Sequence, residues 1–387
     1  MKICFVTPLD PEGCEISGGL LKTSKLIHYL KQYHDVTLVS LTQEKKLVSG
    51  NKFYVSERHK KPSLLNLLKS YLLRKPVSVI RNYNSRLKSE ISELLENVDV
   101  IVVDHFFMYQ YIDRRFDNKT IYHAHNAEFL IWLRRAKLSN NFFAKIVLGF
   151  ESIRVRNMEL DILKRTRFFV AAPNDIQVIK ELDDENLGFK FRETYHLGDD
   201  SLLNKPDLQY SSSSPAICFV GGLNWNPNYD GIKWFLDSSW SLILERLPTT
   251  VLHIVGSASK EQNEYLKTFP NVITHGFVSD IDSVLSKCTA FVCPLKYGSG
   301  MKVKNITALY RGFPIVTTSV GAEGINIRDG FTGFIADTEE LFANRVLEIL
   351  ESQSIFETMS YNARELGCSQ YSWAATLNKF GAVLNEL

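Results

Sequence analysis

The sequence contains no stretch that is long and apolar enough to span a bilayer, and its cysteines form no recognisable pattern. No run of 18 apolar residues occurs among the 387 residues, so we expect no membrane-spanning helix. Pro8, Asp10 and Pro11 interrupt the N-terminal apolar run, which argues against a signal peptide. The six cysteines have neither zinc-site spacing nor a disulfide framework. Several lie in apolar runs, so we expect buried free thiols and a cytoplasmic protein.

Several signatures of cofactor and nucleic-acid binding are also missing. No strand-like run is followed by G-x-G-x-x-G, which argues against a nicotinamide or flavin dehydrogenase, and there is no P-loop signature. No group of His, Asp and Glu has the spacing of metal ligands, so we expect no metal. No known nucleic-acid-binding motif accompanies the basic residues, so nucleic acid is not expected as a partner.

Charge is unevenly distributed along a chain whose net charge is only +2. Residues 1–197 contain 31 Lys and Arg against 23 Asp and Glu, which gives +8, and the remainder contains 14 against 20, which gives −6. We therefore expect the first half to meet an anionic surface or ligand.

Apolar runs alternate with helical patterns in both halves of the chain. The first half opens with strands expected at 2–7 and 36–41, separated by a helix that follows Gly18-Gly19, and strands resume at 98–103 and 120–123. The second half has six apolar runs, at 216–220, 250–255, 272–275, 290–293, 314–318 and 333–336. Such alternation predicts an α/β fold of two Rossmann-like domains facing across a cleft. The four-serine run 211–214 places the joint nearby, giving domains 1–197 and 198–372.

One strand–turn–helix unit has the features of a phosphate site. The strand 290–293 leads to the turn Gly298-Ser299-Gly300, and the helix expected at 301–310 carries Lys302 and Lys304 near its start. Unpaired backbone N–H groups and the helix dipole both favour an anion there, and lysine adds charge. The alternative is a tight turn with solvated lysines.

The chain resembles the GT-B nucleotide-sugar-dependent glycosyltransferases of family 4, also called glycosyl transferases group 1. The segments that carry the resemblance are GSGMKVK at 298–304, GFPIVTTSVGAEG at 312–324, HAHNAE at 123–128, FVGGLNWNPNYDGIKWF at 219–235, and YSW at 371–373. Asp104 closes a strand as in that family. The resemblance implies that the last helix, 373–387, packs back on the first domain.

The resemblance also implies roles for individual residues. His125 and Lys304 would be catalytic, with His123 as the alternative to His125 for contacting a sugar hydroxyl. The donor would be bound by Gly18, Gly19, Gly222, Asn224, Gly298, Ser299, Gly300, Met301, Lys302, Lys304, Thr307 and Glu323. Glu128 is either a ligand contact or a charge at a helix N-terminus.

Ser299 and Thr307 depart from the family pattern. Their positions match two glutamates of the family, which contact the donor sugar and the nucleotide ribose. Thr307 would hold a ribose hydroxyl more weakly than a carboxylate does, and Glu323 is a candidate replacement.

These features together predict a retaining glycosyltransferase of the hexosyltransferase class. It would use a nucleotide-diphosphate sugar as donor substrate, without a cofactor, and a glycan or lipid-linked acceptor in bacterial surface polysaccharide synthesis. Residues 58–88, basic and rich in leucine, are expected to contact an anionic membrane at its inner face. A nucleotide-sugar epimerase and a catalytically silent GT-B subunit remain the alternatives.

Overall fold

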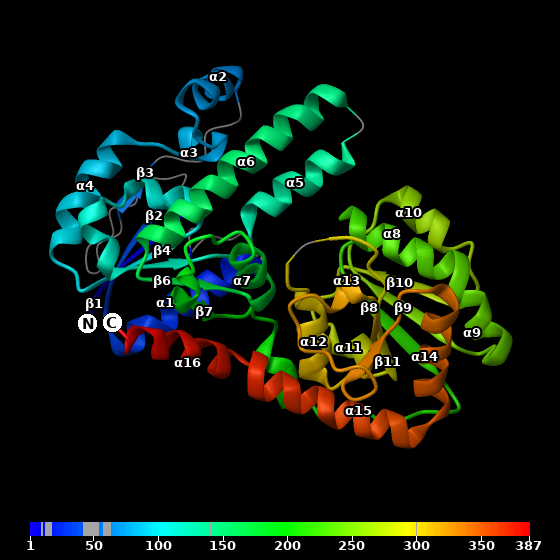
Figure 1. The fold of residues 1–387 in the computed structure, drawn as a ribbon. Coiled ribbons are helices and arrows are strands. Elements are labelled where there is room, and N and C mark those ends of the chain that lie inside the picture. Colours follow the sequence, from blue (N-terminus) through cyan, green and yellow to red (C-terminus); the bar gives the residue numbers. More distant parts are fainter. Residues whose placement is uncertain (9–10, 12–17, 42–53, 57–62, 140, 299) are drawn as a thin grey trace. The chain divides into compact units, whose positions relative to one another are not determined.

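The computed structural model of residues 1–387 comprises two compact units, each built on its own parallel sheet (Figure 1). The described residues are all except 9–10, 12–17, 42–53, 57–62, 140 and 299. One unit consists of Met1–His196 with Leu377–Leu387, and the other consists of Leu197–Thr376. The expected joint near residue 198 lies beside this division.

The N-terminal unit has a seven-stranded sheet in the order β3-β2-β1-β4-β5-β6-β7. Its strands are β1 (Lys2–Thr7), β2 (Asp35–Leu41), β3 (Tyr54–Ser56), β4 (Val100–Asp104), β5 (Thr120–His123), β6 (Phe168–Ala171) and β7 (Phe191–Glu193). Its helices are α1 (Gly18–Tyr33), α2 (Leu64–Leu73), α3 (Val77–Arg81), α4 (Ser85–Glu96), α5 (Glu128–Leu138), α6 (Phe142–Arg165), α7 (Pro173–Lys180) and most of α16 (Trp373–Leu384).

The first strand shows why this sheet is covered on both faces. Ile3 and Phe5 of β1 belong to one apolar cluster with α1 and α16, whereas Cys4 and Val6 belong to the cluster on the opposite face with α4 and α6. Side chains alternate along a strand, so a continuous apolar run requires a core on each side.

The C-terminal unit has a six-stranded sheet in the order β10-β9-β8-β11-β12-β13. Its strands are β8 (Ala216–Val220), β9 (Val251–Val255), β10 (Val272–Gly276), β11 (Ala290–Cys293), β12 (Ile315–Thr317) and β13 (Gly333–Ile335). Its helices are α8 (Asn226–Trp234), α9 (Trp240–Arg246), α10 (Lys260–Leu266), α11 (Asp282–Leu285), α12 (Val303–Arg311), α13 (Ser319–Ala322), α14 (Glu339–Glu351) and α15 (Gln353–Leu366).

Some elements differ from the sequence-based expectation. Helices α2 and α3 lie within the basic, leucine-rich residues 58–88, for which no helix was expected. β3, β6 and β7 were not among the predicted strands either. Among the described helices, none combines the length and apolarity required to cross a membrane.

Candidate functional site

The candidate donor site lies where the order of strands in the C-terminal sheet reverses. β8 and β11 are neighbours there, and the chain leaves them in opposite directions to form β9 and β12. Ligands of parallel α/β sheets bind beyond the carboxyl ends of the strands at this point. The loop that follows β8 contains Gly222 and Asn224, and the turn that follows β11 contains Gly298 and Gly300.

Lys304 joins these two loops. It occupies the second position of α12, and its Nζ donates a hydrogen bond to Oδ1 of Asn228. The same Nζ lies 4.5 Å from the ring centroid of Phe219 and 5.7 Å from that of Trp225. Burial lowers the pKa of Lys304 to about 8. Its ammonium group is thus largely removed from water beside the start of a helix, where a phosphate would replace the lost hydration.

Gly221 gives Lys304 room to approach the backbone. Its φ is +155°, and a Cβ there would lie 2.7 Å from Nδ2 of Asn228 and 3.1 Å from Nζ of Lys304. Asn228 in turn donates from Nδ2 to the carbonyl of Gly222 at 2.8 Å. A side chain at position 221 would therefore displace the lysine or its asparagine partner.

Lys302 lies just before α12, as its N-cap residue, and not in its first turn as expected. The side chain is buried. Its Nζ donates to the carbonyl of Gly300 at 2.6 Å and lies 3.6 Å from Oε2 of Glu323. The structure therefore brings Lys302 and Glu323 together, although they are 21 positions apart in the sequence.

The N-terminus of α12 has no side-chain hydrogen bond at its cap. Gly298 and Gly300 in the preceding turn have φ values of +149° and +71°, which favour glycine. A Cβ at Gly298 would lie 3.5 Å from the ring of Trp225 and 3.8 Å from Nζ of Lys302. The turn thus offers backbone N–H groups next to two cations, as an anion site requires.

Other residues assigned to the donor site have different surroundings. Thr307 donates its hydroxyl hydrogen to the carbonyl of Val303 at 3.2 Å, within its own helix. Asn224 makes a long contact of 3.4 Å from Nδ2 to Oγ of Ser257. Met301 is buried, and Ser299 lies outside the described residues.

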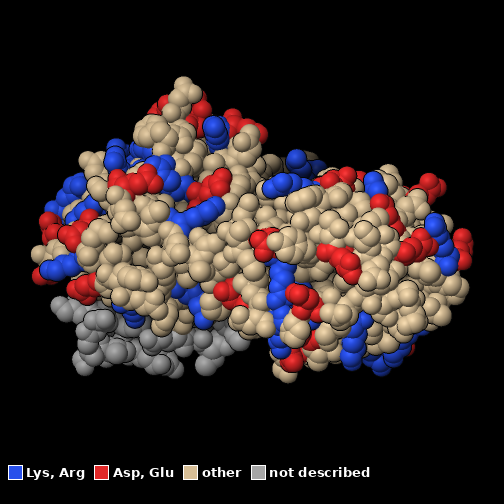
Figure 2. All heavy atoms as spheres, turned by 90° about the horizontal axis from the view of Figure 1, so that it is seen from below, with Lys and Arg blue, Asp and Glu red and all other residues tan. Residues whose placement is uncertain are grey.

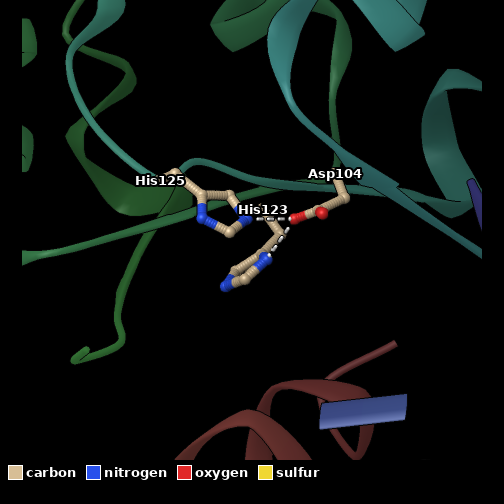
Figure 3. A group of neighbouring side chains, drawn as sticks. All are labelled: Asp104, His123 and His125. Atoms are coloured by element: carbon tan, nitrogen blue, oxygen red, sulfur yellow. Dashed lines mark hydrogen bonds and ion pairs between the residues drawn. The ribbon is translucent and has the colours of Figure 1, made fainter. Parts of the chain in front are cut away.

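In the N-terminal unit, two histidines converge on one carboxylate at the corresponding reversal between β1 and β4 (Figure 3). Nδ1 of His123 lies 2.8 Å, and Nε2 of His125 lies 2.6 Å, from Oδ1 of Asp104. The other oxygen, Oδ2, accepts hydrogen bonds from the hydroxyls of Thr7 at 2.8 Å and Thr23 at 2.9 Å. Asp104 is therefore surrounded by donors on both oxygens.

The charges of this buried cluster follow from those contacts. Burial opposes ionisation of Asp104, but the neighbouring His125 and the hydrogen bonds from both histidines hold its pKa well below the usual value. Burial lowers the pKa of His123 to about 4, with the charge of Lys22 adding to the effect, and burial also lowers the pKa of His125. An ionised Asp104 thus fixes two neutral rings, each donating one N–H to it.

These three side chains also have the donor set of a metal site. Their ligand atoms all lie within 4.8 Å of one another. However, both histidine nitrogens point at the same carboxylate oxygen, and Lys22 places a buried ammonium group close enough to lower the pKa of His123. The arrangement fits a hydrogen-bonded network around Asp104 better than a cation site.

Lys22 is a site residue that the sequence-based reasoning missed. It is buried in α1, and its Nζ has no hydrogen-bond partner among the described residues. Burial lowers its pKa to about 8, while Asp104 and Asp175 act in the opposite direction. Its spacing of four from the buried Leu26 was the available signal, because residues four apart share a helix face.

The ligand-contacting residues predicted in the N-terminal unit include His125 and the pair Gly18 and Gly19. His125 stacks on His105, with ring centroids 4.3 Å apart, and both lie beside Asp104. Gly18 and Gly19 are the first two residues of α1 rather than a loop before it.

Glu128 begins α5, whose N-terminus is bonded from within the protein. The backbone N–H groups of Glu128 and Phe129 donate to Glu159 at 2.9 and 3.0 Å, and that of Ala127 donates to Asp175 at 3.0 Å. The carboxyl oxygens of Glu159 on α6 and Asp175 on α7 thus lie where an anionic ligand would otherwise bind.

Comparison with known proteins shows which proteins this chain resembles. Residues 214–352, which include β8, β11 and α12, match the family described as "Glycosyl transferases group 1". The solved glycosyltransferases that the chain resembles have the GT-B fold, and this chain shares it. The sequence-based prediction of the fold is thereby confirmed, and the match over residues 214–352 agrees with the predicted family resemblance.

Three known proteins are similar to this chain over nearly its whole length. A curated protein of Klebsiella pneumoniae, described as an "uncharacterized 44.6 kDa protein in cps region", is 23% identical over 384 residues, which is 94% of each chain. HepE of Anabaena, solved in complex with UDP, has a TM-score of 0.65 at 15% identity and full coverage of both chains. WaaG, described as a glycosyltransferase involved in lipopolysaccharide biosynthesis, has a TM-score of 0.64 at 12% identity, covering 98% of this chain and 99% of WaaG.

Proposed function

We propose that this glycosyltransferase moves a sugar from a nucleoside diphosphate donor to a glycan or lipid-linked glycan in bacterial surface polysaccharide synthesis. The observation that carries the proposal is the pair of lysines at the start of α12, the buried Lys302 and the partly buried Lys304, beside the strand-order reversal. The structures of HepE in complex with UDP and with UDP-glucose support a donor of this kind. The cps-region relative and WaaG support the setting of polysaccharide synthesis.

The chemistry assigned to the donor site is stabilisation of a leaving diphosphate. Negative charge builds up on the diphosphate as the glycosidic bond breaks, and cations fixed nearby lower the energy of that transition state. Lys304 and the N–H groups of α12 would supply this without a metal cofactor. Lys302 is held by Gly300 and Glu323, and so it would orient the turn as well as contribute charge.

His125 is assigned to the acceptor or the donor sugar. Its Nε2–H donates to Asp104, so Nδ1 is the nitrogen that can accept a hydrogen bond from a sugar hydroxyl. We propose retention of anomeric configuration, with the departing phosphate accepting the acceptor's proton, because no pair of carboxylates is assigned to double displacement.

The acceptor is proposed to lie at the inner face of an anionic membrane. Residues 58–88 contain nine Lys and Arg and no Asp or Glu, and a cluster of this size is sufficient for reversible attachment to anionic lipid.

The test is a thermal-shift screen of nucleoside diphosphate sugars followed by transfer from the best-binding donor. A bound donor stabilises the protein by mass action, and we expect one nucleotide sugar to raise the melting temperature and to serve in transfer to extracted lipid-linked acceptor. Release of an epimerised nucleotide sugar in the absence of acceptor would instead establish an epimerase. Absence of any nucleotide binding would support the silent-subunit alternative.

A further inference from the structure

The N-terminal unit has an apolar surface that its own fold does not cover. On α2, Leu65, Leu68 and Leu72 are 60%, 62% and 83% exposed. They are spaced by three and four residues and therefore share one face of the helix. Three exposed leucines on one helix face are unusual for a helix that packs only on its own domain.

A second helix continues this surface. Phe142, Phe143, Ile146, Phe150 and Ile153 of α6 are between 41% and 78% exposed. The spacing 142, 146, 150, 153 again places side chains on one helix face. α5 and α6 run side by side as a hairpin, and Phe142 and Phe143 lie at the start of α6, next to the connection (Figure 1).

The two helices are in direct contact, so their exposed faces are continuous. The ring of Tyr71 on α2 lies 6.4 Å from that of Phe150 on α6, in an edge-on arrangement. The guanidinium of Arg154 lies over the ring of Tyr71, 4.2 Å from its centroid, and is paired with Glu151 at 2.8 Å. Glu151 also accepts the N–H of Val77 at 2.6 Å, which fixes α6 to the start of α3.

The charged side chains of α2 and of the first turns of α6 are all positive, and Glu151 further along α6 is buried and paired with Arg154. Segments 58–89 and 129–150, which carry α2 and the start of α6, contain nine and four Lys and Arg respectively and no Asp or Glu. The exposed cations next to the apolar residues include Lys69, Arg74, Lys75, Arg135, Lys137 and Lys145. By contrast, the face of the molecule drawn in Figure 2 shows both signs of charge intermixed.

We propose that α2 and the first half of α6 together form a membrane-binding face, with Phe142 and Phe143 inserting among the acyl chains of an anionic bilayer. This surface, here called the α2–α6 face, extends the contact assigned to residues 58–88 by a second helix, and the inference rests on the proposed function. Exposed aromatic and leucine side chains flanked by Lys and Arg are the composition of helices that lie in the membrane interface. A second copy of the chain is a less favourable partner for this face. The thirteen Lys and Arg of these two segments in one copy would face, and repel, the same thirteen in the other.

The experiment is flotation of the full chain with vesicles of phosphatidylcholine, with and without phosphatidylglycerol. We expect wild type to float with anionic vesicles and salt to weaken this binding. Burial of a phenylalanine favours the membrane enough that Phe142→Ser and Phe143→Ser should each reduce partitioning by about tenfold. Phe189→Ser is the matched control, because Phe189 is 68% exposed elsewhere in the same unit, and it should float like wild type.

A spectroscopic readout shows the depth directly. When vesicles are added, the tryptophan fluorescence of Phe143→Trp should shift to shorter wavelength and be quenched by brominated lipids. Both changes should be larger than those of wild type. Transfer to a soluble acceptor should be unaffected in Phe142→Ser/Phe143→Ser, so a failure of membrane binding is distinguishable from a failure of the proposed reaction. Equal flotation of this double variant and wild type, or a wild-type dimer in sedimentation that the double variant breaks, would overturn the proposal.

Discussion

One lysine in each unit, the buried Lys22 and the partly buried Lys304, places a positive charge at each of the two strand-order reversals. Burial lowers the pKa of both Lys22 and Lys304 to about 8. Lys22 is opposed by the carboxylate of Asp104, whereas the bonded partner of Lys304 is the neutral amide of Asn228. A buried cation without a carboxylate partner is costly unless a ligand supplies the negative charge. Lys304 is therefore the residue whose substitution is the most informative.

Lys304→Ala should abolish most transfer without unfolding the protein. Loss of a charged hydrogen bond to phosphate costs about 1.5–3 kcal/mol, which corresponds to roughly a ten- to hundredfold weaker nucleotide diphosphate affinity. Calorimetric titration with nucleoside diphosphate measures this, and circular dichroism checks the fold. Undiminished affinity in a folded variant would show that the anion binds elsewhere.

Donor affinity should also decrease as pH rises through about 8. The charged form of Lys304 is the one that binds phosphate, and its lowered pKa means that this charge is lost at about pH 8 rather than near 10.5. Titrations between pH 6.5 and 9.5 measure the trend. Lys304→Arg stays protonated throughout this range, so its affinity should change much less with pH, and Lys22→Met should retain the wild-type trend.

Thr307→Glu tests the position where the family has a glutamate. Thr307 bonds to its own helix at Val303, and a carboxylate one turn into α12 would reach a ribose hydroxyl more strongly than a hydroxyl does. If threonine replaces that glutamate, the variant should bind nucleotide more tightly than wild type in the same calorimetric assay. Equal or weaker binding would mean that the pocket is built around threonine.

At the scale of elements, the N-termini of α5 and α12 differ in the side chains that lie next to them. α5 is capped by the carboxyl groups of Glu159 and Asp175, which come from other helices. α12 has a lysine as N-cap and no side-chain cap. The dipole favours negative charge at both starts; at α5 the protein's own carboxyl groups lie there, and at α12 we propose that a ligand supplies the charge.

Glu159→Gln should change how stability depends on pH. Burial raises the pKa of Glu159 well above its usual value, despite the hydrogen bonds from Phe129 and Glu128. The folded state thus binds this proton more tightly than the unfolded state, and stability is lost as pH rises through the folded pKa. Urea unfolding at a series of pH values should show a smaller loss in Glu159→Gln than in wild type. Identical slopes would mean that Glu159 is already ionised in the fold.

At the scale of the whole molecule, the last helix belongs mainly to the first unit. Leu377–Leu387 groups with Met1–His196, and Phe380, Val383 and Leu384 are buried with Ile3 and Phe5. The two ends of the chain accordingly lie beside each other in Figure 1. The N-terminal core is therefore completed only when the final residues are in place.

Phe380→Ala should destabilise the N-terminal unit selectively. Truncating a fully buried phenylalanine costs about 3–5 kcal/mol, and Phe380 is 1% exposed in that core. Scanning calorimetry should show a lower unfolding temperature for one transition, while the unfolding temperature of the C-terminal unit stays unchanged. If the two transitions overlap, added nucleotide should stabilise the C-terminal unit and separate them. Asn378→Ala, a substitution on the exposed side of the same helix, is the control, and an equal shift of both transitions would contradict the assignment.

The sequence by itself determined the parallel α/β architecture and the position of the turn that has the features of a phosphate site. Runs such as Ala216–Val220 and Ala290–Cys293 are strands with those bounds, because apolar runs buried on both faces have a period and length that local sequence carries. The α12 lysines and the preceding glycines were likewise visible, since the turn, the helix start and the cations are consecutive in the chain.

Only the tertiary structure decided which distant residues meet. Lys22, Thr7 and Thr23 converge on Asp104 from α1 and β1, Lys302 meets Glu323, and Phe150 meets Tyr71 across 79 positions. Contacts of this kind depend on strand order and helix placement, which follow from burial of the whole core and not from any local pattern. Whether a charged side chain is buried is also decided by the tertiary structure. The residues next to a lysine in the sequence do not show whether its side chain faces water or the core.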